Sequence, residues 1–261
     1  MPELPEVAAF KKYFDGTSLK KKILDLEIND SRILKVPSEN FAETIKGQSF
    51  GSSQRIGKYF FVNLSQTGVV VFHFGMTGSF HYYKDPEDQP KYAQVIFAFD
   101  NSFKLAYISR RKLGWLDIAD SVQEYVQKIK LGEDALSIGF EDFYNKINRG
   151  KSFIKPRLMD QKLMAGVGNW IADEILYQSK IHPESLIQKL TNADFEVMYQ
   201  KMQEVLKTAV KLDAVQENYP EHYLVHNRHT GGKCYHTGEE LVKIEVGGRG
   251  TFYSPQWQTK K

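Results

Sequence analysis

Hydrophobic and polar residues alternate along most of the first half of the chain, a pattern that predicts β-strands. Eight short runs rich in β-branched and aromatic residues are separated by turn sequences such as SQTG and DN. The runs cover 22–29, 48–55, 58–64, 69–74, 79–83, 92–99, 103–108 and 114–118. So many short strands in ~100 residues predict a β-sandwich or barrel. Two helices accompany them, over 6–14 and over 38–46 with Ser38 as N-cap.

The apolar spacing becomes helical in the second half. It predicts helices over 140–148, 154–164, 170–180 and 193–212, and the last carries an apolar stripe typical of a core. LVKIEV and GTFYS in the tail predict a β-hairpin, and LGEDALSIG (131–139) predicts a linker. We therefore predict an α+β protein. An N-terminal β-sandwich domain with flanking helices covers 1–130, and a helical domain covers 140–261 and ends in the hairpin, about 223–261.

Composition narrows the protein class. Hydrophobic residues make up 41% and charged residues 26%, as in folded globular proteins. The single cysteine, Cys234, excludes a disulfide framework and a cysteine-rich zinc site. No apolar stretch reaches the length of a membrane span and the N-terminus lacks the apolar core of a signal peptide, so we expect a soluble intracellular protein without a membrane partner.

Basic residues gather in three places although the net charge is only +3. Six lie between 145 and 170, and shorter clusters lie at Arg110–Lys112 and Lys20–Lys22. Such stripes suit a polyanion groove, and solvated surface is the alternative for each cluster.

The start of the chain, MPELPEV, contains a candidate nucleophile. Removal of Met1 would expose the secondary amine of Pro2, whose ordinary pKa is about 8 and which the positive end of the following helix lowers. Amines attack carbonyl-like carbon, and a proline adduct is an iminium that stays cationic without a proton. Glu3 is placed to donate a proton. A processed terminus without a role is the alternative interpretation.

Three further segments contain candidate binding residues. GVGN places Asn169 at the expected N-cap of a helix, where amide groups suit phosphate oxygens. HFGMTG and RRKLG place Met76 and Leu113 in loops, where apolar side chains could enter a base stack. An ordinary helical hairpin and plain core residues are the alternatives. Lys58 heads a predicted strand, and its pattern alone indicates only a surface residue.

These segments together resemble the formamidopyrimidine-DNA glycosylase / endonuclease VIII family. MPELPEV, GKYF, HFGMTGS, RRKLG, LGEDALS, IKPRLMDQKLMAGVGNWIADEIL and GGRGTFY occur in the family's order and span nearly the whole chain. The resemblance implies a helix-two-turn-helix DNA-binding domain. It also implies a bifunctional DNA glycosylase and AP lyase of base excision repair. The Pro2 amine would attack C1′, and β,δ-elimination would cut the strand.

The resemblance also assigns roles to individual residues. Glu3 matches the general acid, Glu6 a supporting carboxylate, and Lys58 a lysine that contacts DNA and assists catalysis. Asn169 and Arg249 match two phosphate-binding residues, and Lys155 matches a further lysine near the active site. The remaining matches, Met76, Arg111 and Leu113, fill the gap left by the flipped nucleotide, with Arg111 facing the orphaned base. The expected partner is double-stranded DNA containing oxidised bases or abasic sites, bound by a monomer.

Three features of the sequence depart from the family pattern. The four zinc cysteines of the usual finger correspond here to Cys234, Thr237, Ser254 and Trp257, which resembles the zincless-finger branch. We therefore expect no metal and no cofactor, and packing of Tyr253 and Trp257 in place of zinc.

The other departures concern the substrate. Residues 211–228 leave no room for the long loop that closes over 8-oxoguanine. The substrate is then expected among ring-opened purines, hydantoins, oxidised pyrimidines and abasic sites. Leu113 replaces a phenylalanine, so the choice of opposite base is expected to change.

Two alternatives from other classes remain. A catalytically silent binder of damaged or kinked DNA would use the same basic clusters but would not need Pro2 beside Glu3. A metal-dependent nuclease has little support, since His226, His229 and His236 lack partners at metal spacing.

Overall fold

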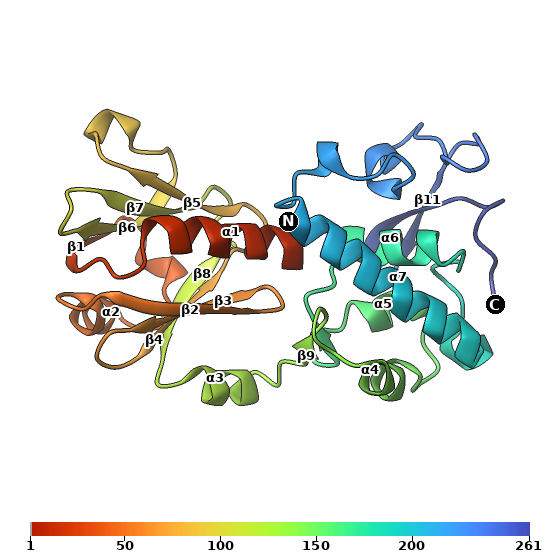
Figure 1. The fold of residues 1–261 in the computed structure, drawn as a ribbon, viewed down its shortest axis with the longest axis horizontal. Helices are drawn as coiled ribbons and strands as arrows, with labels where there is room; N and C mark the ends of the chain where they lie inside the picture. The colour runs from red at the N-terminus through yellow and green to blue at the C-terminus, as the bar shows by residue number, and fades with distance from the viewer. Residues whose placement is uncertain (1) are drawn as a thin grey trace. The chain divides into compact units, whose positions relative to one another are not determined.

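The computed structural model describes residues 2–261, which form two compact units (Figure 1). Unit 1 comprises Pro2 and Glu6–Lys130, and unit 2 comprises Glu3–Pro5 and Leu131–Lys261. The long first helix, α1 (Leu4–Thr17), therefore begins in unit 2 and continues in unit 1.

Unit 1 contains two antiparallel four-stranded sheets. One has the order β1 (Ile23–Ile28), β6 (Ala93–Phe99), β7 (Lys104–Ser109), β5 (Gly78–Tyr83). The other has the order β2 (Phe50–Ile56), β3 (Tyr59–Leu64), β4 (Val69–His73), β8 (Trp115–Ala119). The eight predicted strands are confirmed, because period-two alternation with short turns leaves little choice of secondary structure.

Phenylalanine rings join the two sheets into a sandwich. The rings of Phe50 on β2 and Phe97 on β6 lie 5.4 Å apart, and those of Phe72 on β4 and Phe80 on β5 lie 5.2 Å apart. Phe14 of α1 packs 5.0 Å from Phe50, so the helix closes one end of the same core. Tilted and edge-on ring pairs of this kind add to the stabilisation from burial alone. The predicted β-sandwich with a flanking helix is confirmed.

Two short helices complete unit 1. Helix α2 (Ser38–Ile45) buries Phe41 and Ile45, but its N-cap is Pro37, so the prediction of Ser38 as N-cap was wrong. Pro37 has no side-chain donor or acceptor to offer, and Ser38 is already helical. Helix α3 (Val122–Lys128) was not predicted, although the side chain of Ser121 caps it by accepting from the N–H of Glu124. Three-residue 3₁₀ turns lie at η1 (Ser31–Ile33) and η2 (Pro86–Asp88).

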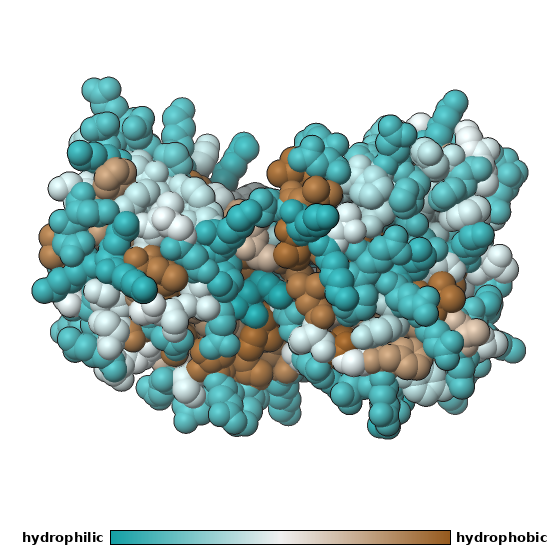
Figure 2. All heavy atoms as spheres, viewed as in Figure 1, coloured by the Kyte–Doolittle hydropathy of each residue, from teal (hydrophilic) through white to brown (hydrophobic). Residues whose placement is uncertain are grey.

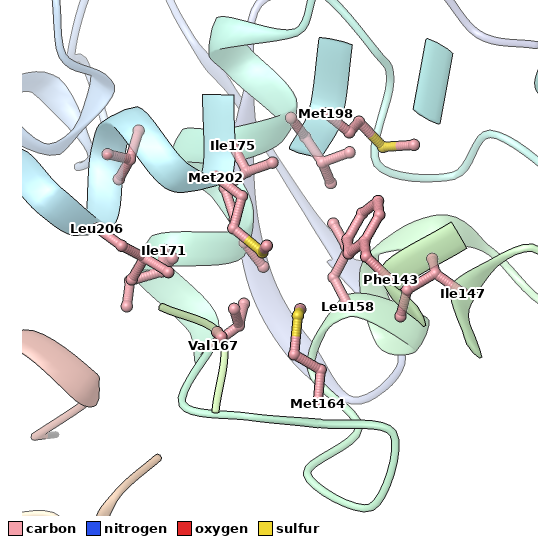
Figure 3. Close-up of a cluster of buried hydrophobic side chains, with 14 of the residues drawn as sticks. Phe143, Ile147, Leu158, Met164, Val167, Ile171, Ile175, Met198, Met202 and Leu206 are labelled. Atoms are coloured by element: carbon pink, nitrogen blue, oxygen red, sulfur yellow. The ribbon is translucent and has the colours of Figure 1, made fainter. Parts of the chain in front are cut away.

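Unit 2 is built on four helices around one apolar core (Figure 3). They are α4 (Phe140–Ile147), α5 (Ile154–Leu158), α6 (Asn169–Gln178) and α7 (Asn192–Lys211). Figure 3 shows Phe143 and Ile147 of α4, Ile171 and Ile175 of α6, and Met198, Met202 and Leu206 of α7 in this cluster. A capping box at Thr191 and Asp194 fixes the start of α7.

The helix predicted over 154–164 is shorter in the structure. It ends at Leu158, and a loop stabilised by Gln161 follows, whose side chain bonds the backbone of Met159, Gly166 and Val167. The chain then forms β10 (Met164–Ala165), which pairs in parallel with β9 (Glu133–Asp134). Strand β9 lies inside the segment predicted as a linker, 131–139.

The tail of unit 2 contains 3₁₀ turns and one hairpin. The turns are η3 (Ile187–Lys189), η4 (Gln216–Asn218) and η5 (Leu224–Asn227), and the hairpin is β11 (Val242–Val246) with β12 (Arg249–Tyr253). Gly247 and Gly248 join its strands with φ of 60° and 72°. Two successive residues at positive φ are the requirement of a type I′ turn, and glycine meets it without strain. The predicted hairpin is confirmed.

Candidate functional site

Hydrophilic residues cover most of the face shown in Figure 2, and hydrophobic residues appear there in small patches. Against this background, Met76 and Leu113 are large apolar residues with exposed fractions of 39% and 49%. Both residues lie in loops, as predicted, and their exposure excludes the alternative that they are plain core residues. Among the described residues, no helix combines the length and apolar character needed to cross a bilayer.

Two loops of unit 1 bring Met76, Arg111 and Leu113 to the same place. A Cβ on Gly75, which has φ of 57°, would lie 2.4 Å from the backbone of Leu113 and Gly114, so only glycine permits this approach. The backbone N–H of Arg111 donates to the Thr77 hydroxyl at 3.1 Å. We call residues 75–77 and 110–113 the exposed loop pair. The loop pair presents two apolar side chains and the Arg111 guanidinium on a backbone that these contacts hold in place.

Two basic residues of the loop pair, Arg110 and Lys112, already have partners. Lys112 Nζ lies 2.6 Å from a carboxylate oxygen of Asp30, and the Arg110 guanidinium lies 5.9 Å from the ring centroid of Tyr92. The Asp30 carboxyl also accepts from Arg32, and these hydrogen bonds lower its pKa strongly. The side chains of Arg110 and Lys112 are therefore held by contacts within unit 1.

Lys58 stands in the turn between β2 and β3 and helps to set the state of His73 at the end of β4. Burial, with the charges of Lys58 and Lys35, lowers the pKa of His73 to about 4, so this imidazole is neutral at pH 7. Its ring stacks on Trp115 with centroids 5.0 Å apart, and its Nδ1 accepts the N–H of Gly75. The remaining proton is therefore on Nε2. Sequence reasoning missed His73, whose only signal is its place ahead of a glycine loop.

At the start of the chain, Pro2 is half-buried and Glu6 lies in the first turn of α1, where the helix dipole favours a carboxylate. Met1, whose removal the amine chemistry requires, lies outside the described residues.

Glu3 is fully enclosed in unit 2 and caps helix α6. Its Oε1 accepts the N–H of Trp170 at 3.0 Å and its Oε2 accepts the N–H of Ile171 at 3.4 Å. A Cβ on Gly168 would lie 2.2 Å from the Glu3 carboxyl carbon, so the glycine makes room for the carboxylate. The two backbone N–H groups that directly follow GVGN, those of Trp170 and Ile171, are thus bonded to Glu3 here. Carboxylates at helix N-termini are stabilised by the unpaired N–H groups and the helix dipole.

Asn169 and Arg249 come together at the hairpin turn. Gly168, not Asn169, is the N-cap of α6, which corrects the sequence-based assignment. Asn169 is the first helical residue, and its Nδ2 donates to the carbonyl of Gly250 at 3.0 Å, while its buried Oδ1 has no hydrogen-bond partner among the described residues. The Arg249 side chain is exposed at the first position of β12. The two predicted phosphate-binding residues are therefore neighbours in unit 2.

Lys155 is completely buried in unit 2. Its Nζ lies 2.7 Å from Oδ1 of Asp173 and donates to the Thr251 hydroxyl. Burial lowers the pKa of Lys155, although the Asp173 carboxylate opposes the change. Asp173 also accepts from Arg228, and neither was predicted, because a carboxylate within a helix usually indicates a solvent-facing position. The rest of the basic stripe is partly internal too, since Arg157 donates to the carbonyl of Lys146.

The finger hairpin packs through rings and hydrogen bonds. Trp257 stacks on His236 with centroids 3.9 Å apart, lies beneath Lys180 Nζ at 4.1 Å, and donates its indole N–H to the carbonyl of Tyr177. Tyr253 contacts the ring of His182 at 4.3 Å. The predicted packing of Tyr253 and Trp257 is confirmed. We call Trp257, His236 and Lys180 the finger clamp.

The one cysteine of the finger is a hydrogen-bonded thiol. Burial raises the pKa of Cys234, but hydrogen bonds involving Ser254, Thr237 and Tyr177 outweigh burial, so the pKa lies below its usual value. Within residues 2–261, no three histidine, cysteine or acidic side chains gather as metal ligands would.

Residues 211–228 are anchored to the core of unit 2. Tyr219 and Tyr223 are buried, and the N–H groups of Leu224 and Val225 both donate to the carboxylate of Glu174 at 3.0 Å. Burial raises the pKa of Glu174 to about 7. This part of the chain is therefore a packed connection.

Comparison with known proteins gives consistent matches along the chain. Residues 1–116 match the model of the formamidopyrimidine-DNA glycosylase N-terminal domain, and residues 131–219 match that of the formamidopyrimidine-DNA glycosylase H2TH domain. A formamidopyrimidine-DNA glycosylase of Arabidopsis thaliana is 31% identical over 99% of this chain and 71% of its own length. One of Streptococcus thermophilus is 30% identical, with both chains covered completely. The solved complex of Lactococcus lactis Fpg with DNA containing an abasic site superposes with a TM-score of 0.90 at 27% identity, covering 99% of this chain and all of the other.

Proposed function

Because this chain belongs to the formamidopyrimidine-DNA glycosylase family and is a DNA glycosylase acting on damaged DNA, we propose that the amine of Pro2 is its nucleophile. The observation that carries this proposal is the anchoring of Glu3. Two backbone N–H groups of α6 hold its buried carboxylate, and Pro2 precedes it by one peptide bond. A rigidly held neighbour restricts where a nucleophile can move, which is what catalysis by positioning requires.

The proposed reaction has three stages. The neutral Pro2 nitrogen attacks C1′, the bond from C1′ to the damaged base breaks with its electron pair leaving on the base, and the sugar ring opens to an iminium. The iminium then draws electrons from C2′, whose proton is lost, and the 3′ phosphate leaves by β-elimination. A second elimination releases the 5′ phosphate, and water frees Pro2. The Glu3 carboxylate is proposed to take up the proton that the attacking Pro2 nitrogen loses and to donate it to the ring oxygen as the bond from C1′ to that oxygen breaks, and Glu6 supports it; the departing base takes its proton from water.

DNA contacts are assigned to both units. Asn169 and Arg249, which adjoin the Gly250 carbonyl, are the proposed phosphate ligands at the lesion, with Lys58 as a further contact. The exposed loop pair is proposed to enter the duplex where the damaged nucleotide leaves the stack. Met76 and Leu113 would fill the gap and Arg111 would face the orphaned base. Exposed apolar side chains on a braced loop suit insertion between bases, because nothing within the protein has to release them first.

The chemistry is tested by borohydride trapping on duplexes containing an abasic site. Reduction should give a stable adduct that peptide mapping locates at Pro2, in protein whose mass shows that Met1 is absent. Pro2→Gly should weaken trapping while DNA affinity is kept. Unchanged trapping in Pro2→Gly would identify another amine, such as Lys58, as the nucleophile. DNA binding without any adduct or strand cleavage would favour the catalytically silent binder.

The preferred lesions are proposed to be ring-opened purines, hydantoins, oxidised pyrimidines and abasic sites rather than 8-oxoguanine. The packed state of residues 211–228 supports this proposal, since the Glu174 carboxylate and the buried Tyr219 and Tyr223 leave the segment little freedom to close over a base. Single-turnover excision rates across matched duplexes test it. Excision of 8-oxoguanine as fast as that of a ring-opened purine would overturn it.

A further inference from the structure

The Asp173 carboxylate of unit 2 is fully buried and bound from three sides. Lys155 Nζ lies 2.7 Å from its Oδ1, Arg228 Nε donates to its Oδ2 at 2.8 Å, and the N–H of Phe252 donates to the same oxygen at 3.4 Å. We call Asp173, Lys155 and Arg228 the Asp173 network. It contains two cations and one anion, of which Lys155 and Asp173 are fully buried and Arg228 is partly exposed.

Stability alone does not account for this network. Removing Lys155 and Asp173 from water costs several kcal/mol per ion, and well-packed apolar residues in such places are often equally or more stabilising. A buried ion network does, however, fix the relative positions of the groups it joins, since each misplaced partner leaves an uncompensated charge. The question is therefore which part of the chain this network fixes.

The network holds the backbone that carries Arg249. Lys155 donates to the Thr251 hydroxyl at 2.6 Å, and that hydroxyl donates to the carbonyl of Arg249 at 2.9 Å. Arg228 donates to the carbonyl of Gly250 at 3.3 Å. Every residue from Arg249 to Phe252 thus has a backbone or side-chain bond into the network or its Thr251 bridge, while the Arg249 side chain stays exposed.

Two further contacts complete the support of this turn. Asn169 donates to the same Gly250 carbonyl at 3.0 Å, so the two carbonyl lone pairs receive Asn169 and Arg228. A Cβ on Gly247 would lie 2.7 Å from Cγ of Pro156, so the turn rests on the residue next to Lys155. The hairpin turn is therefore supported on both sides, at Gly247 by Pro156 and at Gly250 by Asn169 and Arg228.

We propose that Asp173, Lys155 and Arg228 are positioning residues that hold Arg249 and Asn169 in the geometry for phosphate binding at the lesion. Lys155 acts through Thr251 and Asp173 and does not itself contact DNA. This inference rests on the proposed function, because it takes Arg249 as a phosphate ligand. The three residues are then the part of the protein that orients Arg249 and Asn169 toward the phosphate.

The Thr251 bridge offers a test that spares the buried charges. Thr251→Val removes the hydroxyl but keeps the side-chain volume, and Thr251→Ser keeps the hydroxyl. The valine variant should bind duplex DNA with an abasic-site analogue roughly 3- to 10-fold more weakly, as loss of one hydrogen bond predicts, and the serine variant should bind as the wild type does. Equal binding by all three proteins would overturn the proposal.

A double-mutant cycle separates positioning from general loosening. Arg249→Ala should weaken binding and reduce the slope of log affinity against log salt by about one phosphate contact. If Thr251 acts through Arg249, adding Thr251→Val to Arg249→Ala should cost nothing further, whereas independent effects would add. Additivity overturns the positioning role. No effect of Arg249→Ala on its own would instead contradict the proposed function, so the two failures are distinguishable.

Lys155 is tested by the salt slope in the Arg249→Ala background. Lys155→Gln should leave that slope unchanged, because a buried ammonium releases no counterions from DNA. A further fall of about one contact would show that Lys155 binds phosphate directly and would overturn its assignment here. Circular dichroism checks that each variant is folded, and Thr251→Val carries the test if Lys155→Gln is not.

Discussion

The exposed loop pair of unit 1 and the Asp173 network of unit 2 both depart from the usual distribution of side chains. The loop pair exposes apolar residues, and the network buries charged ones. In the loop pair, Met76 and Leu113 are 39% and 49% exposed, although both are apolar. In the network, Lys155 and Asp173 have no exposed surface, although both are charged. Isolated exposed apolar residues are common, whereas fully buried lysines and aspartates are rare unless paired.

The difference lies in what each arrangement costs the protein. Exposing one leucine forgoes a modest gain from burial, so the loop pair can be kept for contacts with an outside partner at little expense in stability. Burying an ion is expensive and becomes tolerable only when all partners are present. The loop pair should therefore be sensitive in function and insensitive in stability, and the network should be sensitive in both.

The largest effect is expected from Asp173→Ala. This change leaves Lys155 and Arg228 without their shared counterion in a buried place, and the free energy of unfolding should fall by about 3 to 5 kcal/mol. Urea unfolding followed by tryptophan fluorescence measures it. Asp88→Ala, at an exposed carboxylate, is the control and should change stability by less than about 0.5 kcal/mol. Similar losses in both variants would mean that the burial of Asp173 is of no energetic consequence.

A pH dependence of nearly this size is expected from Glu174. Its folded pKa of about 7 lies above the ordinary value of 4.5, so between these values the folded protein binds more protons than the unfolded chain. The stabilisation that comes from protonated Glu174 is complete below pH 4.5 and is lost as the pH rises through about 7. The loss amounts to about 3 kcal/mol in the free energy of unfolding. Between about pH 5 and about pH 8, the free energy of unfolding should therefore fall more steeply with pH for the wild type than for Glu174→Gln. Parallel curves would contradict the assignment.

Replacing Trp257 in the finger clamp should have an intermediate effect. Trp257→Leu removes the stack on His236, the contact with Lys180 and the hydrogen bond to Tyr177, which together predict a loss of about 2 kcal/mol. Trp257→Phe keeps a ring in place and should lose less. Thermal unfolding measures both, and addition of a chelator should leave the Tm of the wild type unchanged. A large chelator effect would contradict a clamp made of rings.

The smallest effect on stability is expected from Leu113→Ala, within about 0.5 kcal/mol. Its excision rate on a fully paired duplex should nevertheless fall by roughly 10-fold, a fraction of the few kcal/mol that unstacking a base step costs. On a lesion in single-stranded DNA the same variant should match the wild type, because that base is already unstacked. Equal rate losses on both substrates would contradict insertion of Leu113 and indicate a general defect.

The sequence predicted the elements that depend on short-range patterns. Strands β1 to β8 follow from period-two alternation, and α7 follows from its apolar stripe. Local pattern failed at α5, which ends at Leu158 because Gln161 bonds the backbone of a following loop, a tertiary contact that leaves no periodic signal. It also missed α3, whose short mixed sequence depends on the cap at Ser121.

The same contrast between short-range patterns and tertiary contacts applies to the candidate site. Motif resemblance assigned roles to Pro2, Glu3 and Asn169, since these lie in compact sequence segments, and those roles stay predictions. It could not reveal that Asp173 joins Lys155 to Arg228, because Arg228 lies 55 residues further along the chain and its pairing exists only in three dimensions. It also could not reveal that the N–H groups after GVGN are taken by Glu3. Sequence motifs therefore predict roles for residues that are adjacent in the chain, whereas contacts between distant residues are seen only in the folded structure.

The capping of α6 by Glu3 sets a length as well as a bond. A residue inserted between Pro2 and Glu3 would leave every existing side chain unchanged and extend the tether by up to about 3.5 Å. Misplacement of a reacting group by even ~1 Å can reduce a rate about 100-fold. If Pro2 reacts as proposed, the number of residues between Pro2 and the anchored Glu3 therefore matters as much as their identity.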